Sequence, residues 1–236
     1  MDSLGDNLTD QQSPRSLYVA TIGILSALMA VLSFASIVIP TPLGSYDASS
    51  VLIFAIAVLY GPEIGLISTV IGQLIGKGLL ITYSGLPAVY IPGVVAVRGV
   101  EAYIVGYVGR RLSNTRFGES FAMVIGVVWE TGAFVLADIY LWTFFFGSIA
   151  AGLWAATFTV WTIIDLIWVP LGLAAIYYAR VAFKGHYLDK ELNLVNPPGH
   201  RATFIVSFLI VVFAWGLIII AGLTGVLFSP VFPPPS

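Results

Sequence analysis

Long apolar stretches separated by short polar connections dominate the chain. Seven such stretches cover residues 17–39, 49–60, 64–81, 89–108, 121–145, 152–178 and 203–228. About 20 apolar residues in an α-helix span the hydrocarbon core of a bilayer. The stretches lack the strict alternation that a membrane β-barrel requires. The pattern therefore predicts an all-α integral membrane protein.

The second stretch, residues 49–60, is shorter than a bilayer-spanning helix needs to be. It can cross the membrane only if it tilts, extends into its flanks, or lies buried among neighbouring helices. We therefore expect its environment to differ from that of the other six stretches.

Composition supports a membrane environment. Hydrophobic residues make up 58% of the chain and charged residues 9%, and the mean hydropathy is +0.97, which leaves too little polar surface for a soluble globule. A net charge of -2 gives no reason to expect a nucleic-acid partner. The absence of cysteine excludes disulfides and thiolate metal sites, and we expect neither a metal nor a cofactor.

The basic residues predict the orientation. If the N-terminus is cytoplasmic, eight of the ten Lys and Arg residues lie in cytoplasmic segments, as the positive-inside bias requires. These eight are Arg15, Arg110, Arg111, Arg116, Arg180, Lys184, Lys190 and Arg201. We therefore expect a multi-pass cell-membrane protein with a cytoplasmic N-terminus and an extracellular C-terminus.

The pattern predicts one membrane unit with flanking segments. We expect a polar N-terminal tail over residues 1–14, a six-helix core over 15–182, a cytoplasmic loop over 183–202, an additional transmembrane helix over 203–228 and a proline-rich tail over 229–236. Residues 72–78, GQLIGKG, are too short for a phosphate-binding loop and have no Ser or Thr after Lys77. Any use of ATP must therefore come from another chain, and we expect no enzymatic activity.

Small residues form stripes on two of the predicted helices. Glycines 61, 65, 72 and 76 recur at helical spacing in and before the third stretch, and such pairs let helix backbones approach closely. Packing within the protein is the simpler interpretation of that stripe. The first stretch carries a comparable row, which faces either a sibling helix or a partner subunit: Ala20, Gly23, Ala27 and Ala30.

Several segments together resemble a known family. The segments are residues 27–40 with the following loop, residues 50–65, the glycines of 72–76, the run Arg98-Gly99-Val100-Glu101, and the Gly109-Arg110-Arg111 exit. Over residues 17–182 the chain resembles the substrate-binding S components of energy-coupling-factor (ECF) transporters. The family core has six helices, so the stretch 203–228 is an addition.

The resemblance implies a function and partners. S components capture a vitamin, vitamin precursor or similar micronutrient from outside the cell, and they deliver it with a membrane scaffold (T) subunit and two ATP-binding subunits. By position, residues 41–49 would form the lid over the substrate, with Tyr46 and Asp47 as lid residues. The small-residue row at Ala20, Gly23, Ala27 and Ala30 would contact the scaffold.

Charged residues inside the predicted helices indicate the site. An ionised residue near the bilayer centre costs about 2.5–3.5 kcal/mol on insertion scales, so such residues default to a functional role. The candidates are Arg98, Glu101, Glu130, Asp138 and Asp165. Ion pairs that only lock the helices together are the alternative. The surplus of acids favours a polar or cationic ligand, and a carboxylate ligand bound to Arg98 is the competing hypothesis.

Tryptophans of the sixth stretch extend this site. Trp154, Trp161 and Trp168 recur every seven residues, and Asp165 follows Trp161 by four, so an α-helix would place them on one face. Aromatic faces beside a carboxylate suit a flat heterocycle or a cation, although tryptophans near helix ends often anchor the membrane interface. We expect substrate binding by Arg98, Glu130, Asp138, Trp161 and Asp165.

Two other classes of function stay open from the sequence. An ion-coupled secondary transporter would use the same buried acids as a proton relay, but the seven stretches show no internal repeat. An intramembrane enzyme would use paired carboxylates as acid and base, but no recognised catalytic motif surrounds them.

Overall fold

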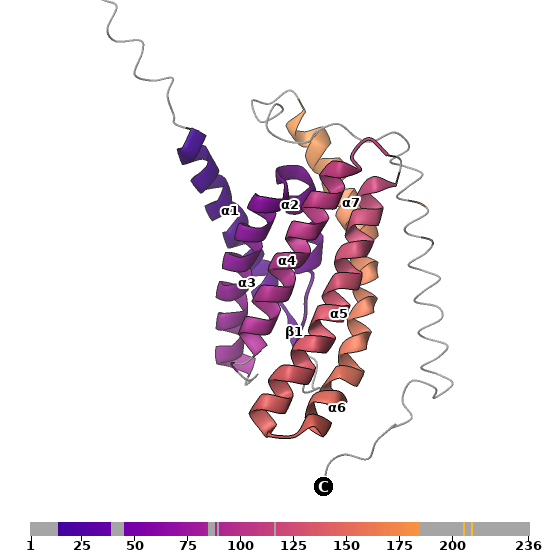
Figure 1. The fold of residues 1–236 in the computed structure, drawn as a ribbon. Helices are drawn as coiled ribbons and strands as arrows, with labels where there is room; N and C mark the ends of the chain where they lie inside the picture. Colours follow the sequence, from indigo (N-terminus) through magenta and orange to yellow (C-terminus); the bar gives the residue numbers. More distant parts are fainter. Residues whose placement is uncertain are drawn as a thin grey trace, which may run out of the picture.

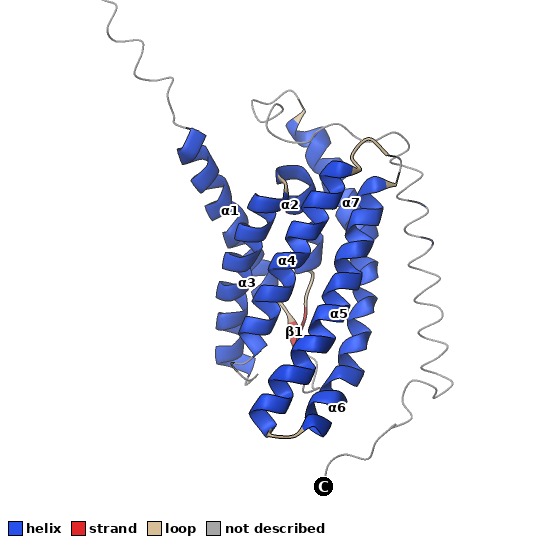
Figure 2. Cartoon of the chain, viewed as in Figure 1, coloured by secondary structure: helices blue, strands red, loops and turns tan. Residues whose placement is uncertain are grey.

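The computed structural model describes residues 14–38, 45–84, 88, 90–115, 117–184, 205 and 209. These residues are almost entirely helical, with one pair of two-residue strands (Figure 2). The elements in chain order are α1 (Pro14–Phe34), β1 (Ile37–Val38), β2 (Ser45–Tyr46), α2 (Ser49–Tyr60), α3 (Pro62–Ser84), α4 (Tyr90–Arg111), α5 (Gly118–Phe146), α6 (Ile149–Thr159), the 3₁₀ segment η1 (Val160–Ile167) and α7 (Trp168–Phe183).

The helices form one bundle (Figure 1). α1 packs on α3, α3 on α4, α4 on α5 and α5 on α6, while α2 lies against α3, α4 and α7. Five of the described helical segments are long and apolar enough to cross a membrane: Ser16–Phe34, Pro62–Ser84, Tyr90–Arg111, Gly118–Phe144 and Ile149–Phe183. The prediction of an all-α membrane protein is confirmed.

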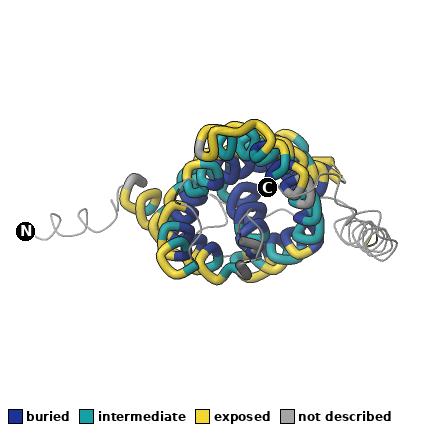
Figure 3. Tube along the Cα trace, turned by 90° about the horizontal axis from the view of Figure 1, so that it is seen from below, coloured by how far each residue is buried: buried dark blue, intermediate teal, exposed yellow. Residues whose placement is uncertain are grey.

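The short helix α2 is the centre of the hydrophobic core. Ile53, Phe54 and Ala57 are fully buried, and Ile56 and Val58 are 1% exposed. Burial on several faces of one helix means that neighbouring helices surround it. Figure 3, which looks along the bundle, shows buried residues toward its centre. Twelve residues therefore suffice, because this helix meets protein rather than lipid. This is the third of the options that its length left open.

The first predicted helix ends earlier than its hydrophobicity suggested. α1 stops at Phe34, whereas the apolar stretch continues to residue 39. Ile37 and Val38 instead pair antiparallel with Tyr46 and Ser45. β-branched residues favour an extended backbone, and the following proline disfavours a helical conformation in the residue before it. The prediction of a helix to residue 39 is therefore wrong at its C-terminal end.

The sixth predicted helix is interrupted. A 3₁₀ segment, η1, separates α6 from α7 within the apolar span Ile149–Phe183. Pro170 lacks the amide hydrogen that would bond to the carbonyl of residue 166. The β-branched residues Val160, Thr162, Ile163 and Ile164 also lose side-chain freedom in an α-helix. Both effects weaken the α-helical hydrogen bonds in this part of the span.

The turn between α2 and α3 depends on one glycine. Gly61 has a positive φ of 93°, a backbone conformation that residues other than glycine rarely adopt. A Cβ atom here would also collide with the guanidinium of Arg110, which donates a hydrogen bond to the carbonyl of Tyr60 at 2.8 Å. Pro62 follows as the first residue of α3, where no amide hydrogen is needed.

Glycines also allow α1 and α3 to approach closely. A Cβ atom at Gly72 would lie 2.8 Å from the carbonyl oxygen of Ser26, and one at Gly76 would lie 2.5 Å from that of Ala30. Real side chains do not tolerate such contacts, so the third-stretch glycines serve packing inside the protein. This agrees with the simpler interpretation of their spacing.

The additional C-terminal helix predicted for residues 203–228 lies largely outside the described residues. Within it, Ile205 and Leu209 are described as helical and exposed. The predicted loop over 183–202, apart from Phe183 and Lys184, and both predicted tails also lie outside the described part of the chain.

Candidate functional site

Arg98 is the centre of a buried cluster of charged side chains. Its guanidinium lies 2.8 Å from a Glu130 carboxyl oxygen, 3.1 Å from Asp165 and 3.4 Å from Glu101. The four side chains come from α4, α5 and η1, and all are buried. Arg98 also donates a hydrogen bond of 2.5 Å to Ser50 at the start of α2. Three of the predicted site residues, Arg98, Glu130 and Asp165, are thus brought together.

The cluster holds more acceptors than the described chain satisfies. One carboxyl oxygen of Glu130 meets the Arg98 guanidinium as an ion pair, while its second oxygen and one oxygen of Glu101 have no hydrogen-bond partner among the described residues. One guanidinium faces three carboxyl groups, which is a formal surplus of two negative charges if all are ionised. Uncompensated charge in a buried site is costly. The cluster therefore suits a partner that supplies hydrogen-bond donors, a cation or protons.

The 3₁₀ segment changes which aromatic residue accompanies Asp165. With three residues per turn, positions three apart share a face, and the Trp168 indole donates a 3.1 Å hydrogen bond to Asp165. The prediction of a shared face for Trp161 and Asp165 assumed an α-helix, and residues 160–167 form a 3₁₀ segment instead. The side chain of Trp161 lies outside the described part of the structure.

Asp138 is not part of the Arg98 cluster. It is half-buried on α5 and accepts a hydrogen bond from Thr159 at the end of α6. It lies two turns farther along α5 than Glu130, toward the α5–α6 turn. Among the described residues, the ion pairs of Arg98 are with Glu101, Glu130 and Asp165, so Asp138 shares α5 with the cluster but lies outside it.

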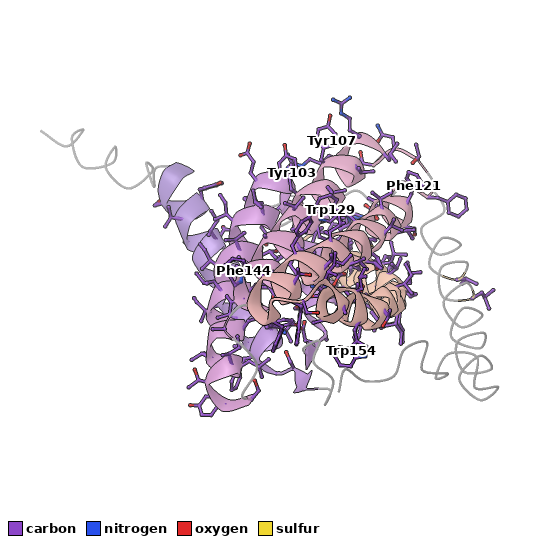
Figure 4. All side chains as sticks on the ribbon, turned by 60° about the horizontal axis from the view of Figure 1, so that its bottom comes forward. Tyr103, Tyr107, Phe121, Trp129, Phe144 and Trp154 are labelled. Atoms are coloured by element: carbon purple, nitrogen blue, oxygen red, sulfur yellow. The ribbon has the colours of Figure 1, made fainter. Side chains whose placement is uncertain are left out.

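Several aromatic side chains lie on the outer surface of the bundle, among them residues labelled in Figure 4. Phe144 is 81% exposed, Phe121 54% and Tyr107 46%. Trp129, next to Glu130 in sequence, is also exposed and donates to the carbonyl of Val97 at 3.3 Å. Exposed aromatic rings on a membrane helix are typical of lipid contact and of the interface.

Asp47, a predicted lid residue, is held by a lysine of α3. Its carboxylate forms a buried ion pair with Lys77, and its other oxygen accepts a 2.8 Å hydrogen bond from the amide of Ser49. Burial alone would raise its pKa, but Lys77 and Arg98 outweigh burial and hold the pKa of Asp47 below its ordinary value of 3.8. Tyr46 is placed in β2, and its side chain lies outside the described residues.

The small-residue row of α1 is divided between two environments. Ala20, Gly23 and Ala27 are exposed, and the space around Gly23 is open. Ala30 is buried against α3 near Gly76. Three of the four predicted partner-contact residues thus lie on a free face of α1, and the fourth packs inside the protein.

A family model described as "ECF-type riboflavin transporter, S component" matches residues 15–177. The chain belongs to the S components of ECF transporters. The match covers α1 to the greater part of α7, so it includes the whole Arg98 cluster and the Lys77–Asp47 pair. No curated protein and no solved structure matches the chain significantly.

As an S component, the chain is a multi-pass, substrate-binding subunit of a membrane transporter rather than an enzyme. This confirms the family indicated by the sequence. The family also gives the buried cluster a context, because a substrate-binding subunit needs polar groups inside an otherwise apolar bundle.

The sequence left out several residues that the structure adds to this region. Ser50 contacts Arg98, and Lys77 pairs with Asp47. Glu101, a charged candidate that the predicted binding set did not include, also contacts Arg98. An intramembrane lysine is itself a signal of function, so Lys77 could have been singled out. The partner of Lys77, 30 residues away, and the contact of Ser50, 48 residues away, have no signature in local spacing.

Proposed function

We propose that the protein captures riboflavin, or a closely related flavin, from the extracellular side and delivers it with a scaffold subunit and two ATP-binding subunits. The main support is the family match over residues 15–177. The description of that family names riboflavin as the transported molecule. The distribution of basic residues supports an N-terminus in the cytoplasm, and then the α5–α6 turn faces outward.

The chemistry of the buried cluster is compatible with this substrate. Riboflavin combines a flat heterocycle with a chain of hydroxyl groups, and it carries no charge at neutral pH. Its hydroxyl groups would donate to the unsatisfied oxygens of Glu130 and Glu101, while Arg98 would donate to its carbonyl oxygens. Aromatic rings from η1 and α7 would contact the heterocycle. In this proposal Arg98, Glu130, Asp138, Trp161 and Asp165 bind the substrate, and Tyr46 and Asp47 close the site.

The first test is whether the purified protein binds riboflavin. We expect quenching of flavin fluorescence on titration, and one flavin per chain in the small molecules released by denaturation. Thiamine, a cation, and biotin, a carboxylate, are the matched probes for the two other ligand charges. If the protein binds only thiamine, its substrate is a cation; if it binds only biotin, its substrate is a carboxylate. Either result would contradict the proposal of riboflavin.

The second test concerns the site. Arg98→Ala and Asp165→Asn should weaken riboflavin binding by about 100-fold or more, because each removes one partner of a desolvated charged contact. Arg111→Ala is the control, since Arg111 is exposed at the end of α4 and bonds to Tyr107. Unchanged affinity in both folded site variants would contradict the site assignment.

An ion-coupled carrier is the second candidate, and the surplus of buried carboxyl groups is the observation that favours it. Uptake into proteoliposomes that contain only this chain separates the two functions. A carrier would transport in response to a pH gradient, whereas an S component needs the scaffold and ATP-binding subunits.

A further inference from the structure

A second buried polar network lies beside the Arg98 cluster, between α1, α2 and α3. Gln73 and Lys77 are four residues apart, so they project from one face of α3. The Gln73 amide donates to Ser49 at 2.8 Å and accepts from Ser33 at 2.8 Å. Lys77 pairs with Asp47. Each of these side chains is less than 10% exposed.

This network fixes the N-terminus of α2. The residue before the helix, Ala48, provides no side-chain cap. Asp47 provides the cap instead. One of its carboxylate oxygens accepts a hydrogen bond from the Ser49 backbone amide, and the other binds Lys77. The first turn of α2 is thus held by α3 through the Asp47 carboxylate and the Ser49 hydroxyl. An anionic group at this end also interacts favourably with the helix dipole.

The two buried networks meet at consecutive residues. Ser49 bonds to Gln73 of the α3 network, and Ser50 bonds to the Arg98 guanidinium. Within the described chain, Ser50 is the only hydrogen-bond partner of Arg98 that is not a carboxyl group. The position of the α2 N-terminus therefore determines where one side of the guanidinium is held.

We propose that Lys77 is a positioning residue for substrate binding: through Asp47 it holds the α2 N-terminus, and through Ser50 that terminus orients Arg98. The proposal rests on the proposed function only in taking riboflavin as the probe. Lys77 does not touch the substrate in this arrangement. Its effect on affinity passes through the first turn of α2.

A purely structural role for Lys77 is the alternative, since polar side chains commonly join helices in membranes. The two roles predict different affinities once the charges of both Lys77 and Asp47 have been removed. Lys77→Met leaves Asp47 buried without its counter-ion, which destabilises the fold as well as the site. In Lys77→Met with Asp47→Asn both positions are neutral, and Asn can still accept the Ser49 amide. Stability should then recover while the link from Lys77 to Asp47 stays broken, and of the two links from α3 to the first turn of α2 only the Gln73–Ser49 hydrogen bond remains.

Riboflavin affinity and thermal stability of the purified full-length chain give the main test. We expect Lys77→Met and the Lys77→Met/Asp47→Asn variant each to bind at least about tenfold more weakly, with the unfolding temperature of the double variant close to that of the parent. Glu119→Gln is the matched control: it breaks a buried ion pair outside both networks, with Arg180, and should lower stability without changing affinity. Parental affinity in the folded Lys77→Met/Asp47→Asn variant would overturn the proposal.

A double-mutant cycle tests the route. The losses of riboflavin affinity caused by Ser50→Ala and by Lys77→Met should not add in the double variant, because each substitution interrupts the same connection to Arg98. Additive losses would overturn the route through Ser50.

A measurement without ligand keeps this inference separate from the proposed substrate. The chain has no cysteine, so Ala48→Cys provides a single thiol beside Asp47. We expect Lys77→Met to speed maleimide labelling at this position at least about tenfold, as the α2 N-terminus is released, and to leave labelling of Ser148→Cys, exposed in the α5–α6 turn, unchanged. Equal labelling rates at position 48 would contradict the inference even if riboflavin does not bind the parent.

Discussion

At the scale of single residues, the buried charges of the described part of the chain fall into three groups with different surroundings. Among those residues Arg98 forms ion pairs with three carboxyl groups, Lys77 with that of Asp47, and Arg180 with Glu119 at 2.5 Å and 3.2 Å. The Arg180 pair is matched in charge. It joins the start of α5 to the end of α7, far along both helices from η1. This pair therefore has the features of a structural contact, in contrast to the Arg98 cluster.

Breaking the Arg180 pair should change stability alone. We expect Arg180→Met to lower the free energy of unfolding by about 3–5 kcal/mol, because it leaves a buried carboxylate unpaired. Arg180→Met with Glu119→Leu should recover most of that loss. Reversible unfolding in mixed micelles measures both changes. A large loss of ligand affinity in the folded double variant would instead connect this pair to the site.

At the scale of elements, α1 has two different faces. One face is closed against α3, where Gly72 and Gly76 allow contact between backbones. The other face carries Ala20, Gly23 and Ala27, and it is exposed. Small residues on an exposed membrane helix suit close association with another helix. This supports the expected scaffold contact for the exposed face.

Substitutions on the two faces of α1 should therefore separate assembly from folding. Ala27→Trp should weaken co-purification with the scaffold subunit by at least about tenfold, because a bulky ring prevents close helix contact, and it should leave ligand affinity unchanged. Gly72→Val should lower thermal stability instead, since its side chain would enter the α1–α3 contact. A complex of normal yield with Ala27→Trp would place the scaffold contact on another helix.

The elements also show what the sequence could and could not predict. Hydropathy located the five membrane-spanning segments and the short helix α2, because burial in lipid or in protein requires the same apolar side chains. It extended α1 through Ile37 and Val38 and treated residues 152–178 as a regular helix, whereas residues 160–167 form a 3₁₀ segment. Both errors arise from backbone geometry, to which hydropathy is blind. In the site, intramembrane charge identified Arg98, Glu130 and Asp165, whereas contacts from distant segments, such as Ser50, depend on the folded bundle.

At the scale of the whole molecule, exposed basic residues gather at one end of the bundle. Arg110 and Arg111 end α4, and Lys184 follows α7. The opposite end contains the α5–α6 turn, Gly147 and Ser148, which carries no charge. This asymmetry follows the positive-inside bias and supports the proposed orientation.

Labelling of intact cells tests this orientation. We expect a membrane-impermeant maleimide to label Ser148→Cys in whole cells and to label Lys184→Cys only after permeabilisation. The parent chain provides the background control because it has no cysteine. The reverse pattern would invert the topology and place the substrate entrance on the cytoplasmic side.

The enclosed position of α2 has a consequence for biogenesis. A helix of 12 residues is about 18 Å long, which is well short of a hydrocarbon core of about 30 Å. The hydroxyl groups of Ser49 and Ser50 bond to α3 and α4, which leave the ribosome later. A nascent chain that ends after Tyr60 thus offers this segment neither a span of sufficient length nor its polar partners. The final placement of α2 must therefore follow the synthesis of α3 and α4. The second apolar segment of the chain reaches its native position only after two later segments have been made.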